Sequence, residues 1–152
     1  MCDLFGEWVP DGWIKAVFEA CEKAPQHRYL FLTKNPKRYG EFGYKRAANM
    51  WYGTTVTEKD DLWRCEYLPA NAYRFVSVEP LNEDICPAFF TVTPTNWVII
   101  GAETGNRKGG IAPKREWMEN IVRECRRQET PVFMKDSLKK IWGKPLIQEY
   151  PW

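Results

Sequence analysis

Short apolar runs alternate along this chain with longer stretches in which apolar residues recur at helical spacing. The runs are rich in Val, Ile, Phe and Tyr, and most stay apolar at successive positions, as is typical of strands buried on both faces of a parallel sheet. We predict strands at residues 29–33, 50–56, 73–78, 97–100 and 131–134. We predict helices at 11–23 and 113–128, and a third, with a weaker pattern, at 58–68.

This alternation predicts an α/β fold with a parallel sheet of five or six strands and flanking helices. Five strands are too few to close an eight-stranded barrel, so the sheet is either open or part of a TIM-like (β/α) barrel. We expect a single domain over residues 1–152. Leu4, Phe5 and Gly6 look like a loop that leaves a strand, so we expect the chain to begin inside a larger fold. The sheet edge left unpaired in this way favours self-association.

The composition narrows the partners and the compartment. With 22 basic and 20 acidic residues, the chain lacks the basic excess of a protein that binds nucleic acid by charge. Its five cysteines are widely spaced and form no C-x-x-C pair, which predicts a cytoplasmic protein and matches no zinc or iron–sulfur spacing. Neither a membrane span nor a signal peptide is supported, because no apolar stretch is long enough and no charged-then-apolar leader is present.

A polar residue ends or follows each predicted strand. The set comprises Lys34, Thr55, Glu79, Glu103 and Lys135. Parallel strands share one carboxyl edge, where α/β proteins bind ligands, so five separate segments bring these groups to one rim. We predict a shared functional mouth there. The alternative is that Glu79 and Glu103 are solvated loop residues or ion-pair partners of the two lysines.

Glu79 and Glu103 permit two kinds of chemistry. A retaining glycosidase needs two carboxyl groups roughly 5 to 5.5 Å apart, one of which stays protonated. Lysines at the same rim favour the ionised form of both carboxylates, so the residues favour an ion-paired polar cup for a small zwitterionic ligand. The small Ser77 shares a strand face with Glu79, and Gly101 shares one with Glu103, which leaves room beneath the carboxylates.

Other catalytic or phosphate-binding motifs are weak in this chain. The glycines of GAETGNRKGG at 101–110 fit neither the dinucleotide nor the Walker template. Arg107 and Lys108 in this loop offer charges to a phosphate or carboxylate, and a solvated loop is the alternative. His27, the single histidine, lies between a helix and a strand, which leaves little for a Ser-His-Asp or Cys-His relay.

Seven segments between Asp3 and Trp152 carry a family resemblance. They are DLFGEWVP, HRYLFLTKNPKR, WYGTTVT, RFVSVEPL, NWVIIGAETG, PVFMKDS and PLIQEYPW, and the most specific are RFVSVEPL and WVIIGAETG. In this order they resemble an uncharacterised family of phage and prophage proteins with a radical S-adenosylmethionine-like barrel. Its members carry an N-terminal cysteine-rich segment with a C-x-x-C element that would hold an iron–sulfur cluster. That segment is absent here, so the chain is similar to the C-terminal two-thirds of the family fold.

The resemblance implies a barrel fragment or degenerate relative that keeps a polar ligand mouth. It implies S-adenosylmethionine as a ligand, with its amino group or ribose hydroxyls held by an acidic strand-end residue. We therefore expect catalytic roles for Glu79, Glu103 and Lys135, and cofactor binding by Lys34, Thr55 and Glu103.

The alternative function is that of a phage accessory protein that binds a host protein or nucleic acid without catalysis. The stretches 35–46 and 123–127 interleave basic residues with aromatic or apolar ones, as such a surface would. The alternative, which the residues favour, is that these stretches are solvated helix faces. Joint exposure of certain tryptophans beside two arginines would favour binding, whereas burial of the tryptophans would favour a plain core. The residues concerned are Trp8, Trp13, Trp51, Trp63, Arg38 and Arg46.

Overall fold

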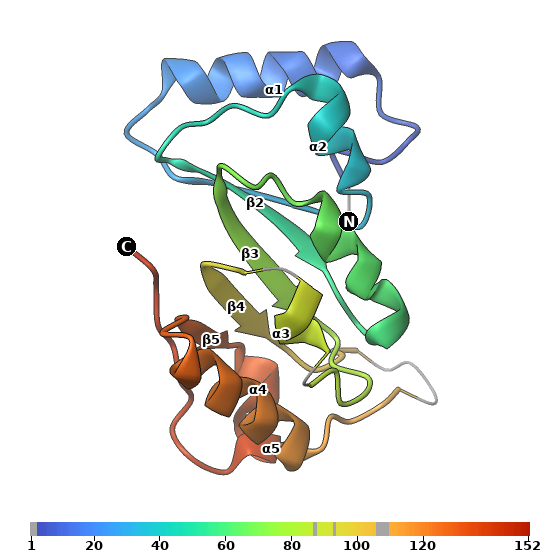
Figure 1. Cartoon of the computed structure of the whole chain (residues 1–152), viewed down its shortest axis with the longest axis vertical. Helices are drawn as coiled ribbons and strands as arrows, with labels where there is room; N and C mark the ends of the chain where they lie inside the picture. The colour runs from blue at the N-terminus through green and yellow to red at the C-terminus, as the bar shows by residue number, and fades with distance from the viewer. Residues whose placement is uncertain (1–2, 87, 93, 106–109) are drawn as a thin grey trace.

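The structure, a computed structural model, describes residues 3–86, 88–92, 94–105 and 110–152 (Figure 1). At its centre is a five-stranded, all-parallel sheet whose strands lie in the chain order β1-β2-β3-β4-β5. The strands are β1 (Tyr29–Thr33), β2 (Met50–Thr55), β3 (Tyr73–Val78), β4 (Trp97–Ile100) and β5 (Val132–Met134). The predicted parallel α/β sheet is confirmed, and β2 and β5 are each one residue shorter than predicted.

Helical segments occupy the connections between the strands. The α-helices are α1 (Asp11–Lys23), α2 (Lys37–Phe42), α3 (Phe89–Val92), α4 (Arg115–Arg127) and α5 (Lys139–Trp142). The 3-10 helices are η1 (Lys59–Tyr67) and η2 (Asp136–Leu138). The predicted helix at 11–23 is confirmed, α4 lies inside the predicted 113–128, and the segment predicted at 58–68 is a 3-10 helix.

The two long helices, α1 and α4, form because each has favourable residues at its N-terminus and one apolar face. Pro10 and Lys114 precede them in extended conformation, and an acidic residue in each first turn favours the helix dipole. Their buried residues recur three or four positions apart, as the amphipathic pattern predicts. These residues are Ile14, Phe18 and Cys21 in α1, and Met118, Ile121 and Cys125 in α4.

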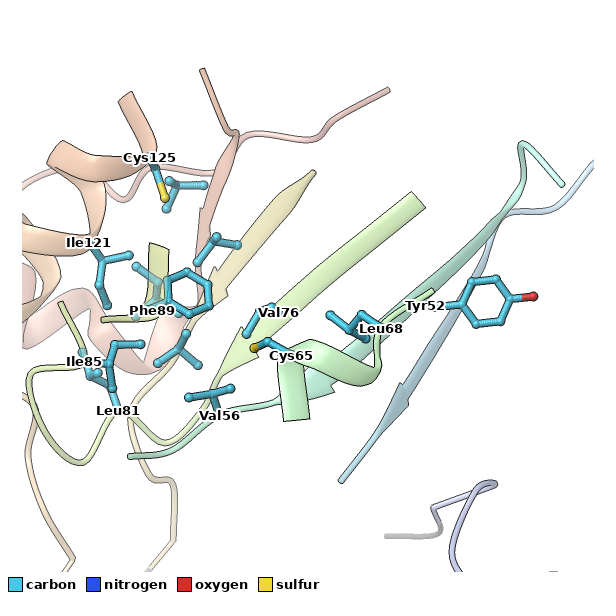
Figure 2. Close-up of a cluster of buried hydrophobic side chains, with 14 of the residues drawn as sticks. Tyr52, Val56, Cys65, Leu68, Val76, Leu81, Ile85, Phe89, Ile121 and Cys125 are labelled. Carbon is cyan, nitrogen blue, oxygen red and sulfur yellow. The ribbon is translucent and has the colours of Figure 1, made fainter. Parts of the chain in front are cut away.

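One face of the sheet is covered by the helices. Strands that follow one another in chain order with right-handed crossovers place their helices on the same side. The strand residues that alternate toward that side include Phe31, Tyr52, Val76, Ile100 and Met134, and they share one core with the buried residues of the helices. Figure 2 shows part of this core, from Tyr52 on β2 to Cys125 on α4.

The opposite face of the sheet carries a separate aromatic cluster. Its buried members are Trp51, Phe75 and Trp97 from three neighbouring strands, with Ile99 and Phe133 packed against them. The C-terminal segment covers part of this face, since the rings of Tyr150 and Trp152 contact that of Trp97 at centroid separations of 6.0 and 5.2 Å. This face would point into the lumen of a (β/α) barrel, which has the same order of strands.

The two edges of the sheet differ. At β5, residues 147–149 return along the outer edge, where the amide of Met134 donates to the carbonyl of Ile147 and that of Glu149 to the carbonyl of Val132. Among the described residues, β1 pairs with β2 and with no other strand. Leu30 and Leu32 of β1 are 43% and 41% exposed on the face opposite the helices. Self-association through this edge stays a prediction.

None of the described helices has the length and apolar character needed to cross a bilayer.

Candidate functional site

Three strand-end residues form one row at the carboxyl edge of the sheet. β3, β4 and β5 end in register, and their last residues are followed by Glu79, Gly101 and Lys135. Neighbouring strands lie about 4.8 Å apart, so the backbones at the two ends of this row are roughly 10 Å apart. The long side chains nevertheless meet, because the ammonium of Lys135 donates to a carboxylate oxygen of Glu79. The alternative considered from the sequence, in which Glu79 is an ion-pair partner of Lys135, is therefore confirmed.

Gly101 makes this contact across two strands possible. A Cβ atom at Gly101 would lie 2.8 Å from Oε1 and 2.9 Å from Cδ of Glu79, closer than real Cβ atoms approach such neighbours. The glutamate side chain therefore occupies the space that any other residue in the middle of the row would fill. The room expected at Gly101 is present, and it is the Glu79 side chain that lies in it.

The ion pair lines an open cavity of about 430 Å³. The side chains of Glu79 and Lys135 are 26% and 44% exposed, so both charges remain accessible to a ligand. Polar groups from η2 and from the returning C-terminal segment complete the wall. The further lining residues are Thr104, Phe133, Asp136, Ser137 and Gln148.

Lys34 and Thr55 line a different cavity, of about 600 Å³, beside β1. Its wall is largely apolar, with Trp8, Leu30 and Leu32 among its residues. Thr55 is buried at 7% exposure, and Lys34 is exposed. The predicted cofactor-binding residues Lys34 and Thr55 thus line the same cavity, but this cavity is not the one that Glu79 and Lys135 line.

Asp3 organises the carboxyl end of β1. One of its carboxylate oxygens accepts hydrogen bonds from the hydroxyl of Thr33 at 2.9 Å and from the amide of Lys34 at 3.0 Å. The other accepts from the amide of Phe5 at 3.0 Å. Sequence reasoning did not identify Asp3, because its partners on β1 and just after it, Thr33 and Lys34, lie 30 and 31 residues away and the DLFG segment gives no local sign of them.

Glu103 lines a third cavity, of about 230 Å³, together with Ala102, Gly105 and Ile111. The strands that precede Glu79 and Glu103 are neighbours in the sheet, as the glycosidase hypothesis requires. Glu79, however, is ion-paired with Lys135 in another cavity, so the two carboxylates do not line one shared cavity as a glycosidase pair would. Ser137 lines both cavities, and its hydroxyl accepts a hydrogen bond of 3.0 Å from the amide of Ala102.

Some of the other residues that line the Glu79–Lys135 cavity could have been predicted from the sequence, and others could not. Asp136 and Ser137 follow directly after Lys135, so extending the strand-end pattern by two positions would have found them. Gln148 carries no such sign, because it reaches the site through a single antiparallel bridge to Phe133.

The described cysteines do not fit an iron–sulfur cluster. Cys21, Cys65 and Cys125 are buried on separate helical segments, and no group of three or more His, Cys, Asp or Glu residues in the described ranges is arranged to hold a metal. Burial raises the pKa of Cys65, Cys86 and Cys125 to about 12, which disfavours the thiolate that binds a metal. Cys2, Arg107 and Lys108 lie outside the described residues.

The aromatic and basic residues of the binding hypothesis do not form one exposed set. Trp8, Trp13 and Trp63 are 77%, 67% and 41% exposed, whereas Trp51 is buried at 3% in the aromatic cluster. Arg38 is also buried, at 7% exposure.

Arg38 instead holds the N-terminal segment in place. Its guanidinium donates to the carbonyls of Gly6 and Val9 and forms an ion pair of 3.0 Å with Asp11. Arg38 is therefore not exposed beside the tryptophans, as the binding hypothesis requires, because backbone carbonyls some 30 residues away in sequence accept hydrogen bonds from its guanidinium.

Comparison with known proteins places the chain in one family. The model of a family described as "Protein of unknown function (DUF5131)" matches residues 1–145. No curated protein and no solved structure matches the chain.

Proposed function

Since the chain belongs to the DUF5131 family, whose description assigns no activity, we propose a function from the site: the carboxyl edge of the sheet binds a small zwitterionic ligand. The observation that carries this proposal is the Glu79–Lys135 pair across Gly101. A ligand with an α-amino acid group presents an ammonium for Glu79 and a carboxylate for Lys135. The two protein charges then exchange one partner for another, and neither is left unpaired.

The energetics of the pair support such an exchange. Both side chains are partly exposed, and exposed ion pairs contribute only about 0–1 kcal/mol to stability. Opening the pair therefore costs little. A bound ligand excludes water from the cavity, and hydrogen bonds to charged groups then contribute about 1.5–3 kcal/mol each. The cavity volume of about 430 Å³ lies within the range of small-molecule sites.

S-adenosylmethionine is the first candidate ligand. It joins an α-amino acid group to an adenosyl group, and its amino acid end fits the charges of Glu79 and Lys135. Glu103, Lys34 and Thr55 line the two other cavities at the same edge of the sheet. In this proposal they contact the rest of the ligand. The proposal ends at binding, because the described cysteines do not fit the cluster that radical chemistry would need.

The test is calorimetric titration of the protein with three ligands: S-adenosylmethionine, free methionine and methylthioadenosine, which lacks the amino acid group. Replacing Glu79 by Gln should weaken binding of the first two about tenfold or more and leave binding of the third unchanged. Glu116→Gln is the matched control, because Glu116 lies exposed in the first turn of α4. Replacing Glu103 by Gln should also weaken binding of S-adenosylmethionine, with little change in melting temperature.

If none of the three ligands binds saturably, the proposal is contradicted. Equal binding by the wild type and Glu79→Gln would contradict it as well. A loss of several degrees in melting temperature on replacement of Glu103, without any ligand found, would assign Glu103 a structural role.

A further inference from the structure

A second polar pocket lies at the amino end of the sheet, opposite the Glu79–Lys135 pair. It has a volume of about 530 Å³ and is lined by residues that precede β2, β3 and β4 or begin β3. Its polar residues are Arg46, Asn71, Arg74 and Asn96, and four of the other lining residues are alanines. No carboxylate is among the described residues that line it. The wall is therefore cationic, and its small side chains leave space for a ligand.

Arg74 is the unusual member of this pocket. It is the second residue of β3 and is partly buried, and its Nε atom is buried without a hydrogen-bond partner. Two other arginines whose side chains are largely removed from solvent have carboxylate partners, in the pairs Arg38–Asp11 and Arg64–Asp61. Within the described residues, no ion pair is formed by Arg74 or by the exposed Arg46.

An unpaired, partly buried guanidinium carries a cost that an anion would offset. Burial lowers the pKa of Arg74, which is the expected effect of desolvation on a cation. The group still stays charged near neutral pH, because arginine deprotonates only far above it. Proteins ordinarily pair such a charge with a carboxylate or with a bound anion. The pocket supplies no carboxylate, so the guanidinium of Arg74 is available to a bound anion.

The geometry points to a phosphate-binding site in this pocket, and we propose that it takes the phosphate group of a small molecule. Guanidinium groups bind phosphate oxygens through paired N–H donors, and two arginines line this cavity. Asn96 adds a donor, because its side-chain oxygen already accepts from the amide of Arg74 at 2.9 Å and its amide nitrogen remains for a ligand. This site is independent of the zwitterion site and lies at the other end of the strands.

The test is calorimetric titration with inorganic phosphate and with adenosine monophosphate, at ionic strength held constant with chloride. We expect saturable binding of at least one of them to the wild type. Replacing Arg74 by Met, which keeps the apolar stem, should weaken that binding about tenfold or more. Replacing the exposed Arg46 by Met should weaken it as well. Arg123→Met is the control, since Arg123 lies exposed on α4 away from the pocket. The Arg123→Met protein should bind phosphate as the wild type does.

The two ligands distinguish the source of the phosphate. Tighter binding of adenosine monophosphate assigns the site to a phosphorylated organic molecule, and equal binding assigns it to phosphate itself. Absence of saturable binding to the wild type overturns the proposal, as does binding that neither arginine substitution changes. Should Arg74→Met fail to fold, Arg46→Met decides, because Arg46 is exposed and its side chain can be shortened without opening the core.

Discussion

Replacement of Gly53 by Ala tests how tightly the aromatic face of the sheet is packed. Gly53 lies in β2 beside Phe75 of β3, and a Cβ atom there would lie 2.4 to 2.6 Å from three atoms of the phenylalanine ring. Carbon atoms prefer separations of about 3.5–4.0 Å, so the ring must move by roughly 1 Å. Phe75 is 2% exposed and packs against Trp97 at a centroid distance of 6.0 Å, which leaves it little freedom to move.

The expected loss follows from two opposing effects. Adding a methyl group to a well-packed core costs about 1–3 kcal/mol. Alanine also restricts the unfolded chain, which returns about 0.4–1 kcal/mol, since Gly53 does not have a positive φ and Ala can adopt its backbone conformation. Because Phe75 is enclosed, the packing cost lies in the upper part of its range, and the net change is a loss of about 1–2 kcal/mol in the free energy of unfolding. For a chain of this length, it corresponds to a fall of about 2–8 °C in melting temperature.

The assay is thermal and urea unfolding of Gly53→Ala, with Gly40→Ala as the matched control. Gly40 is exposed in α2, and a methyl group added to it would have no atom within 4 Å, so alanine there should stabilise the helix by about 0.5–1 kcal/mol. A second change, Phe75→Leu, should recover part of the loss caused by Gly53→Ala. Opposite signs for the two glycines support the reasoning. A Gly53→Ala protein as stable as the wild type would refute it.

Two further predictions concern the edges of the sheet. The bond to Arg126 lowers the pKa of Glu149, so the contribution of Glu149 to stability is present above its unfolded pKa of about 4.3 and is lost as the pH falls below it. Replacing Glu149 by Gln should therefore lower the free energy of unfolding by up to about 1 kcal/mol near neutral pH and by less in acid, as measured by urea unfolding at both pH values. A difference between wild type and variant that is the same at both pH values would contradict this. At the other edge, light scattering of the concentrated protein should show self-association that Leu32→Glu reduces, and a monomeric wild type would oppose it.

The fold was predictable where the sequence pattern is long and regular. Each strand is a local apolar run, and α1 and α4 have enough turns to show an apolar face. The short helices α2, α3 and α5, at Lys37–Phe42, Phe89–Val92 and Lys139–Trp142, were missed because four to six residues do not establish a helical period. They are fixed by packing against the rest of the chain, as Arg38 in α2 illustrates through its bonds to the N-terminal segment.

The candidate site was predictable as an edge of the sheet, but its division into cavities was not. A parallel sheet brings its strand ends to one side whatever the register, so a common edge for Lys34, Thr55, Glu79 and Lys135 follows from the strands alone. Which side chains meet depends on register and on reach. Glu79 contacts Lys135 two strands away because β3, β4 and β5 end level and the middle residue of the row, Gly101, has no side chain. Glu103 lies three residues past the end of β4, where the alternation of the strand no longer sets its direction.

The aromatic face and the polar edge are connected through the glycines of the sheet. Phe75 of β3 lies over Gly53 of β2, and Glu79, which follows β3, lies over Gly101, which follows β4. At each position a larger side chain occupies the space above a glycine next to it in the sheet. The consequences of adding a methyl group differ because the displaced groups differ. At Gly53 it displaces a rigid ring enclosed by other rings, and the cost appears as lost stability. At Gly101 it displaces the end of a flexible, partly exposed carboxylate, so the cost falls on the Glu79–Lys135 contact and on any ligand that uses those charges.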